Sequence, residues 1–383
     1  MNKEKTILLY CEDPGACNVI MGLLLFLKKE KAKTVLLCHS QATQYLKQRG
    51  IRNLITCDEK TSNVSNILKK YKPYIVITGT SENKKSFGLK LIKESKENNI
   101  LTAGYVDSPA STEKRFAGST DDFFAFAPHY ILAPCEITKN EFAKLGFPKE
   151  SIFVIGNLYY DWVREFRENL KTLNDKEEKI KLFGKDSVSK KIITFASEKN
   201  YVDDTQEPFM LPQSYKRKKF KSDKRTSLVL ELVIEGIKNR KDIYHLNLLL
   251  HPKDDFKEYE HLQSGINQVI NSTFPLKIAY YSDLVIGLTT SLLTESQILG
   301  TNSLSVLLNK EEKKFTTGTN NGLIRTIYEC SDLYKLLKRE STYKKIDLNS
   351  ILSKISFSNQ EELSLLLEAV VLHKENFGRF SLF

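Results

Sequence analysis

The feature that most constrains the fold is an alternation of short apolar runs with longer amphipathic stretches. The runs have the length of strands, and the stretches between them carry apolar residues at helical spacing. Strands that are apolar on both faces, alternating with helices, predict a parallel sheet covered by helices on each side. In the first 160 residues the expected strands are Thr6–Tyr10, Thr34–Cys38, Leu54–Cys57, Tyr74–Thr78, Leu101–Val106 and Tyr130–Ala133.

The pattern stops and then restarts, which indicates two domains. Ile152–Ile155 is the last strand of the first series, and a second series begins at Ile192–Ala196. A chain of 383 residues is also too long for one ordinary core. We therefore predict an α/β protein with two Rossmann-like domains and a cleft between them. The expected segments are residues 1–160, a linker at 161–190, a second domain at 191–359 and, within 360–383, a helix that packs on one domain or bridges both.

Composition narrows the class of protein. With 41% hydrophobic and 27% charged residues the chain is expected to be globular and soluble. No apolar run approaches the roughly 20 residues that span a bilayer. The six cysteines are scattered without a CxxC pair, so they predict reduced thiols in the cytoplasm and no zinc site.

The net charge of +11 is concentrated in one segment. Lys216–Arg225 holds seven basic residues and one acidic residue, within a polar insert at 198–226. It is either a solvated loop or a contact for an anionic acceptor or membrane surface, which would make the protein peripheral at the inner face of the plasma membrane. The chain has no helix-turn-helix, zinc-finger or RNP signature, so a nucleic-acid partner is not predicted.

Ligands of parallel α/β sheets bind beyond the carboxyl ends of the strands, so the candidate residues are those that follow strands. In the first loop, Glu12–Asn18, Gly15 permits close backbone approach and the helix start beyond it favours an anion. Asn18 contacts that ligand or serves as the N-cap of the helix.

Asp107 follows the fifth strand, where a carboxylate could serve as a general base. The alternative is that it accepts backbone hydrogen bonds in the turn before Pro109. Ser108, directly after it, is a candidate substrate contact.

Two loops of the second half carry candidates for phosphate binding. His251 and Lys253 follow the strand Asn247–Leu250, with Pro252 between them to stiffen the turn. His251 would either donate a hydrogen bond to a phosphate or have only a structural role.

The strongest local pattern is a strand that ends at Gly287 and is followed by hydroxyl residues and a helix. Thr289, Thr290 and Ser291 with the helix N–H groups would cradle a phosphate, and Glu295 one turn later would accept both hydroxyls of a ribose. The alternative is a well-capped helix with an exposed Glu295.

These residues resemble the donor site of GT-B-type glycosyltransferases, and Ala133-Pro134-Cys135 with Ile155-Gly156-Asn157 is similar to the segment that closes their N-terminal domain. The resemblance implies a GT-B fold and a metal-independent enzyme of bacterial surface-polysaccharide synthesis, such as lipopolysaccharide or capsule. Its donor would be a UDP- or CMP-sugar, without a further cofactor, and its acceptor a glycan or glycolipid.

A second resemblance is to bacterial sialyltransferases and related CMP-sugar transferases, which carry a His-Pro motif, a Ser/Thr motif and an acidic motif. His251-Pro252 and Thr290-Ser291 match the first two. The acidic pair followed by glycine is absent, and Glu12-Asp13-Pro14-Gly15 is the nearest sequence to it. The base would accordingly be Asp107 or, failing that, Asp13, with His251 assisting the leaving phosphate.

The same segments are also similar to UDP-N-acetylglucosamine 2-epimerases. Those enzymes carry an Asp-Ser-Gly-Gly cradle, where this chain has Thr289-Thr290-Ser291-Leu292. A glycosyltransferase is therefore preferred. The alternatives are a nucleotide-sugar epimerase or hydrolase and a non-catalytic nucleotide-sugar-binding protein.

Overall fold

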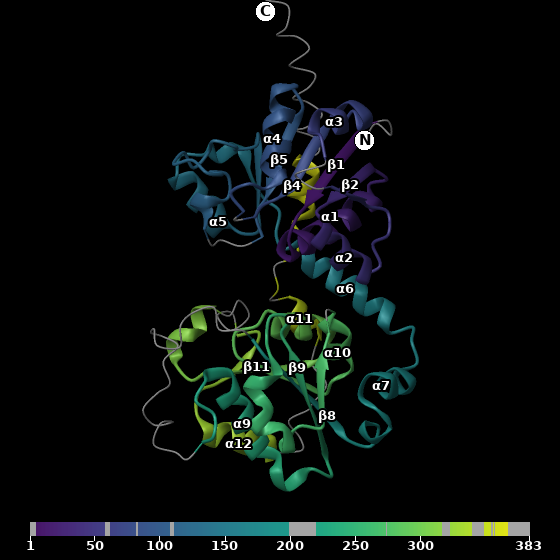
Figure 1. Ribbon diagram of the computed structural model, residues 1–383, viewed down its shortest axis with the longest axis vertical. Helices are drawn as coiled ribbons and strands as arrows, with labels where there is room; N and C mark the ends of the chain where they lie inside the picture. Colours follow the sequence, from purple (N-terminus) through teal and green to yellow (C-terminus); the bar gives the residue numbers. More distant parts are fainter. Residues whose placement is uncertain are drawn as a thin grey trace, which may run out of the picture. The chain divides into compact units, whose positions relative to one another are not determined.

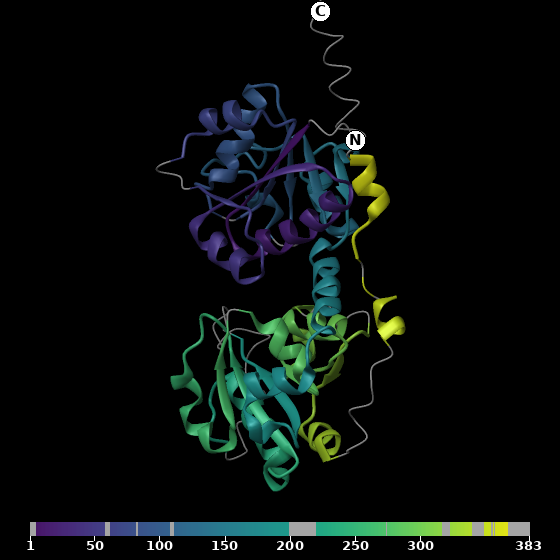
Figure 2. The same cartoon turned by 90° about the vertical axis from the view of Figure 1, so that its right-hand side faces the viewer.

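The computed structural model describes residues 5–57, 62–81, 83–107, 111–198, 220–272, 274–315, 322–338, 348–353, 355 and 357–366. The contacts divide the chain into unit 1, Met1–Trp162 with Ser356–Phe383, and unit 2, Val163–Ile355. Each unit is a parallel sheet with helices on both faces, as Figures 1 and 2 show for each. The predicted α/β class with two Rossmann-like sheets is confirmed. The cleft expected between the domains stays a prediction.

Unit 1 holds a seven-stranded sheet, sheet A, in the order β3-β2-β1-β4-β5-β6-β7. Its strands are β1 (Thr6–Cys11), β2 (Lys33–Cys38), β3 (Ile55–Thr56), β4 (Ile75–Gly79), β5 (Leu101–Tyr105), β6 (Tyr130–Ala133) and β7 (Ile152–Val154). Its helices are α1 (Pro14–Lys29), α2 (Ser40–Gln48), α3 (Val64–Tyr71), α4 (Phe87–Glu97), η1 (Thr112–Lys114), α5 (Glu136–Lys144) and η2 (Lys149–Ser151). Helix α6 (Leu158–Leu170) begins in unit 1 and ends in unit 2.

Unit 2 holds a six-stranded sheet, sheet B, in the order β10-β9-β8-β11-β12-β13. Its strands are β8 (Lys191–Ala196), β9 (Tyr244–Leu250), β10 (Gln268–Asn271), β11 (Leu284–Gly287), β12 (Asn302–Val306) and β13 (Arg325–Ile327). Its helices are α7 (Asp175–Phe183), η3 (Lys185–Ser187), α9 (Arg225–Ile237), η4 (Lys238–Arg240), η5 (Phe256–Gly265), α10 (Pro275–Tyr281), α11 (Leu292–Leu299), η6 (Lys310–Phe315), α12 (Cys330–Lys338) and α13 (Leu348–Leu352).

The order of the strands locates one switch point in each sheet. In sheet A the chain builds outward from β1 to β3 and then returns to add β4 on the other side of β1. In sheet B it builds from β8 to β10 and then adds β11 on the other side of β8. Loops diverge at the carboxyl ends of β1 and β4, and of β8 and β11, and such points are where open α/β sheets bind ligands.

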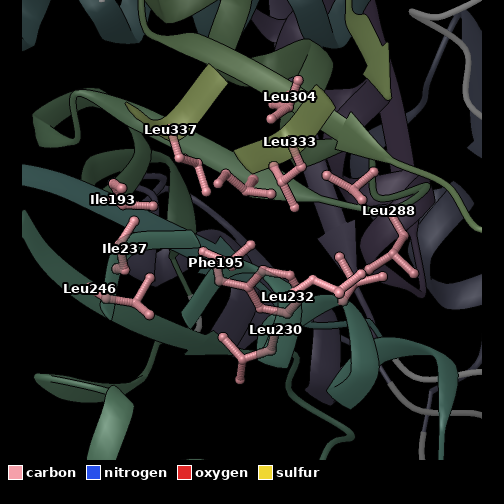
Figure 3. Packing of buried hydrophobic residues seen from close by; sticks show 14 of the residues in the cluster. Ile193, Phe195, Leu230, Leu232, Ile237, Leu246, Leu288, Leu304, Leu333 and Leu337 are labelled. Carbon is pink, nitrogen blue, oxygen red and sulfur yellow. The ribbon is translucent and has the colours of Figure 1, made fainter. Parts of the chain in front are cut away.

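The core of unit 2 explains why its strands are continuous apolar runs. Phe195 of β8, Leu246 of β9 and Leu232 of α9 belong to one buried cluster, to which α12 adds Leu333 and Leu337 (Figure 3). Each of these side chains is at least 95% buried, and burial of such a side chain stabilises the fold by about 1.5–3 kcal/mol. The sheet is therefore a rigid platform for the loops at its edge.

The C-terminal segment of unit 1 packs on its own sheet. Asn359 N–H donates to the Ile155 carbonyl at 2.8 Å, and Ser358 N–H donates to Asp161 Oδ2 at 2.8 Å. The helix at 360–366 (yellow in Figure 2) buries Leu363 and Leu366. Residues 367–383, the rest of the predicted C-terminal helix segment, lie outside the described residues.

Several elements differ from the expectation. Helix α1 begins at Pro14, inside the segment Glu12–Asn18 that was expected to be a loop, because Asp13 caps it and proline suits the first helical turn. The short strands β10 and β13 were not predicted, because edge strands of three or four residues carry too little apolar pattern.

Candidate functional site

The carboxyl edge of sheet A gathers carboxylates. Asp13 follows β1 and Asp107 follows β5, and both lie against Gly15. A Cβ atom on Gly15 would overlap Asp107 Oδ2 and would lie 3.4 Å from Asp13 Oδ1. Gly15 is therefore needed for the close approach of the two loops, and it brings together the two predicted candidate bases.

The two aspartates have different partners. Asp13 Oδ1 accepts the Ala16 N–H at 2.9 Å, which makes Asp13 the N-cap of α1. Within the described residues no protein group donates to its Oδ2. Asp107 forms an ion pair with Arg115, with Nη1 3.1 Å from Oδ1.

Burial raises the pKa of Asp13, and the neighbouring carboxylates of Asp107 and Glu12 raise it further. The Ala16 N–H and the Arg115 guanidinium act in the opposite direction and offset part of this rise. A carboxylate with a raised pKa and one oxygen without a protein donor is better suited to take a proton from a hydroxyl.

Two further groups at this edge were missed by the sequence analysis. Glu12 accepts hydrogen bonds from Ser86 Oγ and Asn83 Nδ2, both at 2.5 Å, and so ties the loop after β1 to the loop after β4. Thr80, at the end of β4, is 95% buried, and its hydroxyl has no hydrogen-bond partner among the described residues. The position of Thr80 after a buried strand was the available signal.

Asn18 and Ser108 were also predicted to belong to this edge. Asn18 is not the N-cap of α1, because Asp13 holds that place; Asn18 lies within the helix and accepts a hydrogen bond from Tyr45 Oη at 2.7 Å. Ser108, predicted to contact substrate, lies outside the described residues.

The carboxyl edge of sheet B gathers hydrogen-bond donors. Gly287 ends β11, and Thr289, Thr290 and Ser291 lead into α11 as predicted. The Leu292 N–H donates to Thr290 Oγ1 at 3.3 Å. Among the described residues, no protein acceptor takes the backbone N–H groups of Thr290 and Ser291, so both remain available to an anion.

Gly287 keeps this loop close to the neighbouring strand. A Cβ atom there would lie 2.9 Å from Thr290 Cγ2 and 3.4 Å from the Ala196 carbonyl oxygen of β8. A larger residue would push the loop away from the end of β8.

Glu295 is buried, contrary to the alternative of an exposed residue. Its side chain lies in the first turn of α11 and is 6% exposed, and Oε1 accepts the Ser291 hydroxyl at 2.9 Å. Ser291 and Glu295 are thus held together at the start of the helix. Their roles as phosphate and ribose contacts stay predictions.

His251 follows β9 directly, as expected. The backbone N–H of His251 donates to Ser197 Oγ at 2.9 Å. Its ring Nδ1 accepts the backbone N–H of Lys253 at 3.2 Å. An acceptor at Nδ1 requires that the proton of the neutral ring be on Nε2, which makes Nε2 a donor. Lys253 is exposed on the same turn.

Glu198 is the residue at this edge that sequence reasoning missed. It follows β8 and accepts both the N–H and the hydroxyl of Thr289 at 2.8 Å. Arg225 donates to it at 2.7 Å and also pairs with Glu312. The available signal was the position of Glu198 immediately after a buried strand at the switch point.

The basic segment Lys216–Arg225 needs a correction at its end. Arg225 is 1% exposed and paired with two carboxylates, so it is part of the interior and not of a basic surface. Lys224 pairs with Glu258 at 3.0 Å. Lys216–Lys219 lie outside the described residues.

The described residues contain neither a metal-binding cluster nor a membrane-spanning helix. No group of three or more His, Cys, Asp and Glu side chains is arranged to hold a metal ion. None of the described helices has the length and apolar character needed to cross a membrane.

Two Rossmann-like sheets, each with polar loops at its carboxyl edge, define an α/β fold of the GT-B type. The solved structures agree. UDP-GlcNAc 2-epimerase from Neisseria meningitidis, bound to UDP-GlcNAc, is 14% identical over 96% of this chain and 100% of its own, with a TM-score of 0.64. The Methanocaldococcus jannaschii UDP-GlcNAc 2-epimerase is 12% identical over 96% and 99%, with a TM-score of 0.62.

A variant of the wall teichoic acid polymerase TagF is 14% identical over 99% of this chain and 90% of its own, with a TM-score of 0.54. No family model matches the sequence. No curated protein matches it in sequence either. At such identities the similarity establishes the fold, and the chemistry has to be argued from the residues themselves.

Proposed function

We propose that the protein is a metal-independent glycosyltransferase that moves a sugar from a nucleotide sugar to a hydroxyl of a cell-surface glycan or glycolipid. The observation that carries the proposal is the complementary chemistry of the two edges. Sheet A presents a half-buried carboxylate of raised pKa, Asp13, and sheet B presents unused N–H donors at Thr290 and Ser291. A glycosyl transfer needs both a base and an anion site.

In this proposal unit 2 binds the donor. The N–H groups of Thr290 and Ser291 donate to the phosphate, where the start of α11 adds favourable dipoles. His251 Nε2–H and the exposed Lys253 add a donor and a positive charge. Glu295 accepts the ribose hydroxyls.

Unit 1 binds the acceptor, and Asp13 is the base. The acceptor oxygen attacks the anomeric carbon, its proton passes to Asp13 Oδ2, and the bond from the anomeric carbon to the phosphate oxygen breaks. The leaving phosphate takes the negative charge and is stabilised by the donors of unit 2. The sequence favoured Asp107 as the base. In this proposal Asp107 is not the base, because its carboxylate is paired with Arg115, which it holds beside Asp13.

A nucleotide-sugar 2-epimerase is the second candidate. Solved structures with this fold include UDP-GlcNAc 2-epimerases, among them a complex with UDP-GlcNAc. The two neighbouring aspartates at Gly15 could also remove and return a proton on the sugar itself. A binding protein without catalysis would need neither aspartate.

The proposal also includes a UDP or CMP donor nucleotide, a peripheral location at the plasma membrane and a membrane contact of the segment Lys216–Arg225. Arg225 would take no part in a membrane contact, because it is buried, whereas Lys221 and Lys224 of the same segment are exposed.

The test is incubation of the purified protein with UDP- and CMP-sugars, with and without glycan acceptors. Release of nucleotide that depends on the acceptor is the expected result. An epimer formed without acceptor would assign the protein to the second candidate, and binding without turnover would favour the non-catalytic one. Glu295→Ala should weaken donor affinity about tenfold by loss of the ribose contacts, whereas Glu235→Ala, on the exposed side of α9, should not change it.

A further inference from the structure

Glu198 occupies a place that a phosphate oxygen would be expected to take. Its carboxylate accepts two donors from one residue, the N–H and the hydroxyl of Thr289, each at 2.8 Å. The next two N–H groups of the same loop, at Thr290 and Ser291, have no acceptor among the described residues. The loop therefore offers four consecutive donor groups to an anion, and an internal carboxylate has taken two of them.

The carboxylate is held there by a buried arginine. Arg225 is 1% exposed; its Nη1 donates to Glu198 at 2.7 Å, and its Nε donates to Glu312 at 2.8 Å. Glu312 is fully buried. Burial raises the pKa of Glu312, although the positive charge of Arg225 lowers it in part.

Two carboxylates therefore share one guanidinium, and when both are ionised the cluster carries an excess of one negative charge. A second anion cannot approach the Thr289 donors while Glu198 accepts them, because two negative charges would compete for the same hydrogen atoms. A phosphate that binds across Thr289, Thr290 and Ser291 has to replace Glu198 at Thr289.

We propose that Glu198 is an internal competitor of the donor phosphate and sets the affinity of unit 2 for phosphate-bearing nucleotides. The inference rests on the proposed function, since it assumes that a nucleotide sugar binds at this loop. Displaced from Thr289, Glu198 keeps its ion pair with Arg225, so that its charge does not become unpaired. Because Glu198 has to be displaced first, the affinity of unit 2 for the phosphate is lowered. Thr289 donates to the phosphate only after the ligand has displaced Glu198.

A purely structural role predicts the opposite result. If Glu198 only braced the loop, its removal would loosen Thr289 and weaken the binding of nucleotides. If it competes with phosphate, its removal strengthens that binding and leaves the binding of nucleosides unchanged, because a nucleoside carries no phosphate.

The experiment compares wild type with Glu198→Gln by calorimetric titration of UDP, CMP, uridine and cytidine. Glutamine keeps the shape and an acceptor oxygen but carries no charge. We expect the Kd of the nucleotide that binds to fall about tenfold and that of its nucleoside to stay the same. Glu312→Gln is the matched control. It also removes one of the two negative charges that surround Arg225, but it does not change the contacts of Thr289, so the affinity for the nucleotide should not rise.

If Glu198→Gln and Glu312→Gln increased the nucleotide affinity equally, the gain would come from the loss of negative charge alone, and the inference would be overturned. An unchanged or weaker nucleotide affinity in Glu198→Gln would also overturn it. If the glutamine variant does not fold, Glu198→Ala serves in its place, because it removes the carboxylate from Thr289 and leaves Arg225 paired with Glu312. It too should bind the nucleotide more tightly, and unchanged affinity would reject the inference. If neither wild type nor variants bind any nucleotide, the proposed function itself fails.

Discussion

At the carboxyl edge of sheet A the loops present acceptors, Asp13 and Asp107, whereas at the edge of sheet B they present donors, the N–H groups of Thr290 and Ser291. Both edges lie at a switch point, and both contain one buried arginine paired with carboxylate. The backbone topology is thus common to the two units, and the side chains that follow the strands decide what each can bind.

The two arginines differ in how much water reaches their partners. Arg115 is 7% exposed but Asp107 is 28% exposed, so solvent still screens that pair. Arg225 and Glu312 are 1% and 0% exposed. An arginine–carboxylate ion pair is therefore part-exposed at the acidic edge of unit 1 and fully buried in the cluster of unit 2.

The largest expected effect concerns the acidic edge. Asp13→Asn should lower turnover about 10²–10⁴-fold, because an amide cannot take the acceptor proton. Asparagine caps helices as well as aspartate does, so α1 should remain intact. The measurement is the rate of acceptor-dependent nucleotide release together with the unfolding temperature.

Asp107→Asn is the matched variant for the same edge, since it removes the other aspartate beside Gly15. Its expected loss is about tenfold, through the loss of charge on the Arg115 pair. If Asp107→Asn abolished turnover while Asp13→Asn kept it, the base would be Asp107.

A comparison of the two arginines gives the next largest effect. Arg225→Met leaves Glu198 and Glu312 without their buried cation, and it should lower the free energy of unfolding by about 3–5 kcal/mol. Arg115→Met leaves only the part-exposed Asp107, and about 1 kcal/mol is expected. Urea unfolding of both variants measures the difference; equal losses would contradict the contrast between a closed cluster and an open edge.

The smallest effect is the pH dependence of stability. Burial raises the pKa of Asp13 above 3.8, so the folded protein holds this proton more tightly than the unfolded chain. The resulting stability is fully present below the unfolded-state pKa and is lost as pH rises through the folded-state pKa.

Wild type should therefore lose more of its free energy of unfolding than Asp13→Asn as pH rises from about 4 to neutral. Thermal unfolding at a series of pH values measures it. Parallel curves for the two proteins would mean that Asp13 is not held in a proton-favouring environment.

Much of the site could be predicted because it follows strands. The apolar runs that end at Tyr105, Leu250 and Gly287 locate Asp107, His251 and the hydroxyl residues after β11 at sheet edges. Local pattern also indicated Glu295 in the first turn of a helix. Such predictions need only the period of the sequence and the rule that strand ends converge.

The contacts of those residues could not be predicted in the same way. Glu198 and Thr289 are 91 residues apart in sequence, and Arg225 and Glu312 are 87 apart. Arg225 looks like one more member of a basic run, yet its burial is decided by two acidic residues from other elements.

The sequence alone therefore determined the alternation of strands and helices, the division into two parallel sheets and the residues at the strand ends, since these depend on local hydrophobic period. Only the tertiary structure decided which of those residues are partnered. It assigned Asp13 as a helix cap of raised pKa, paired Asp107 with Arg115 and placed Glu198 on Thr289. The reason is physical: charge, burial and hydrogen bonding depend on neighbours in space, and the chain brings those neighbours from distant positions.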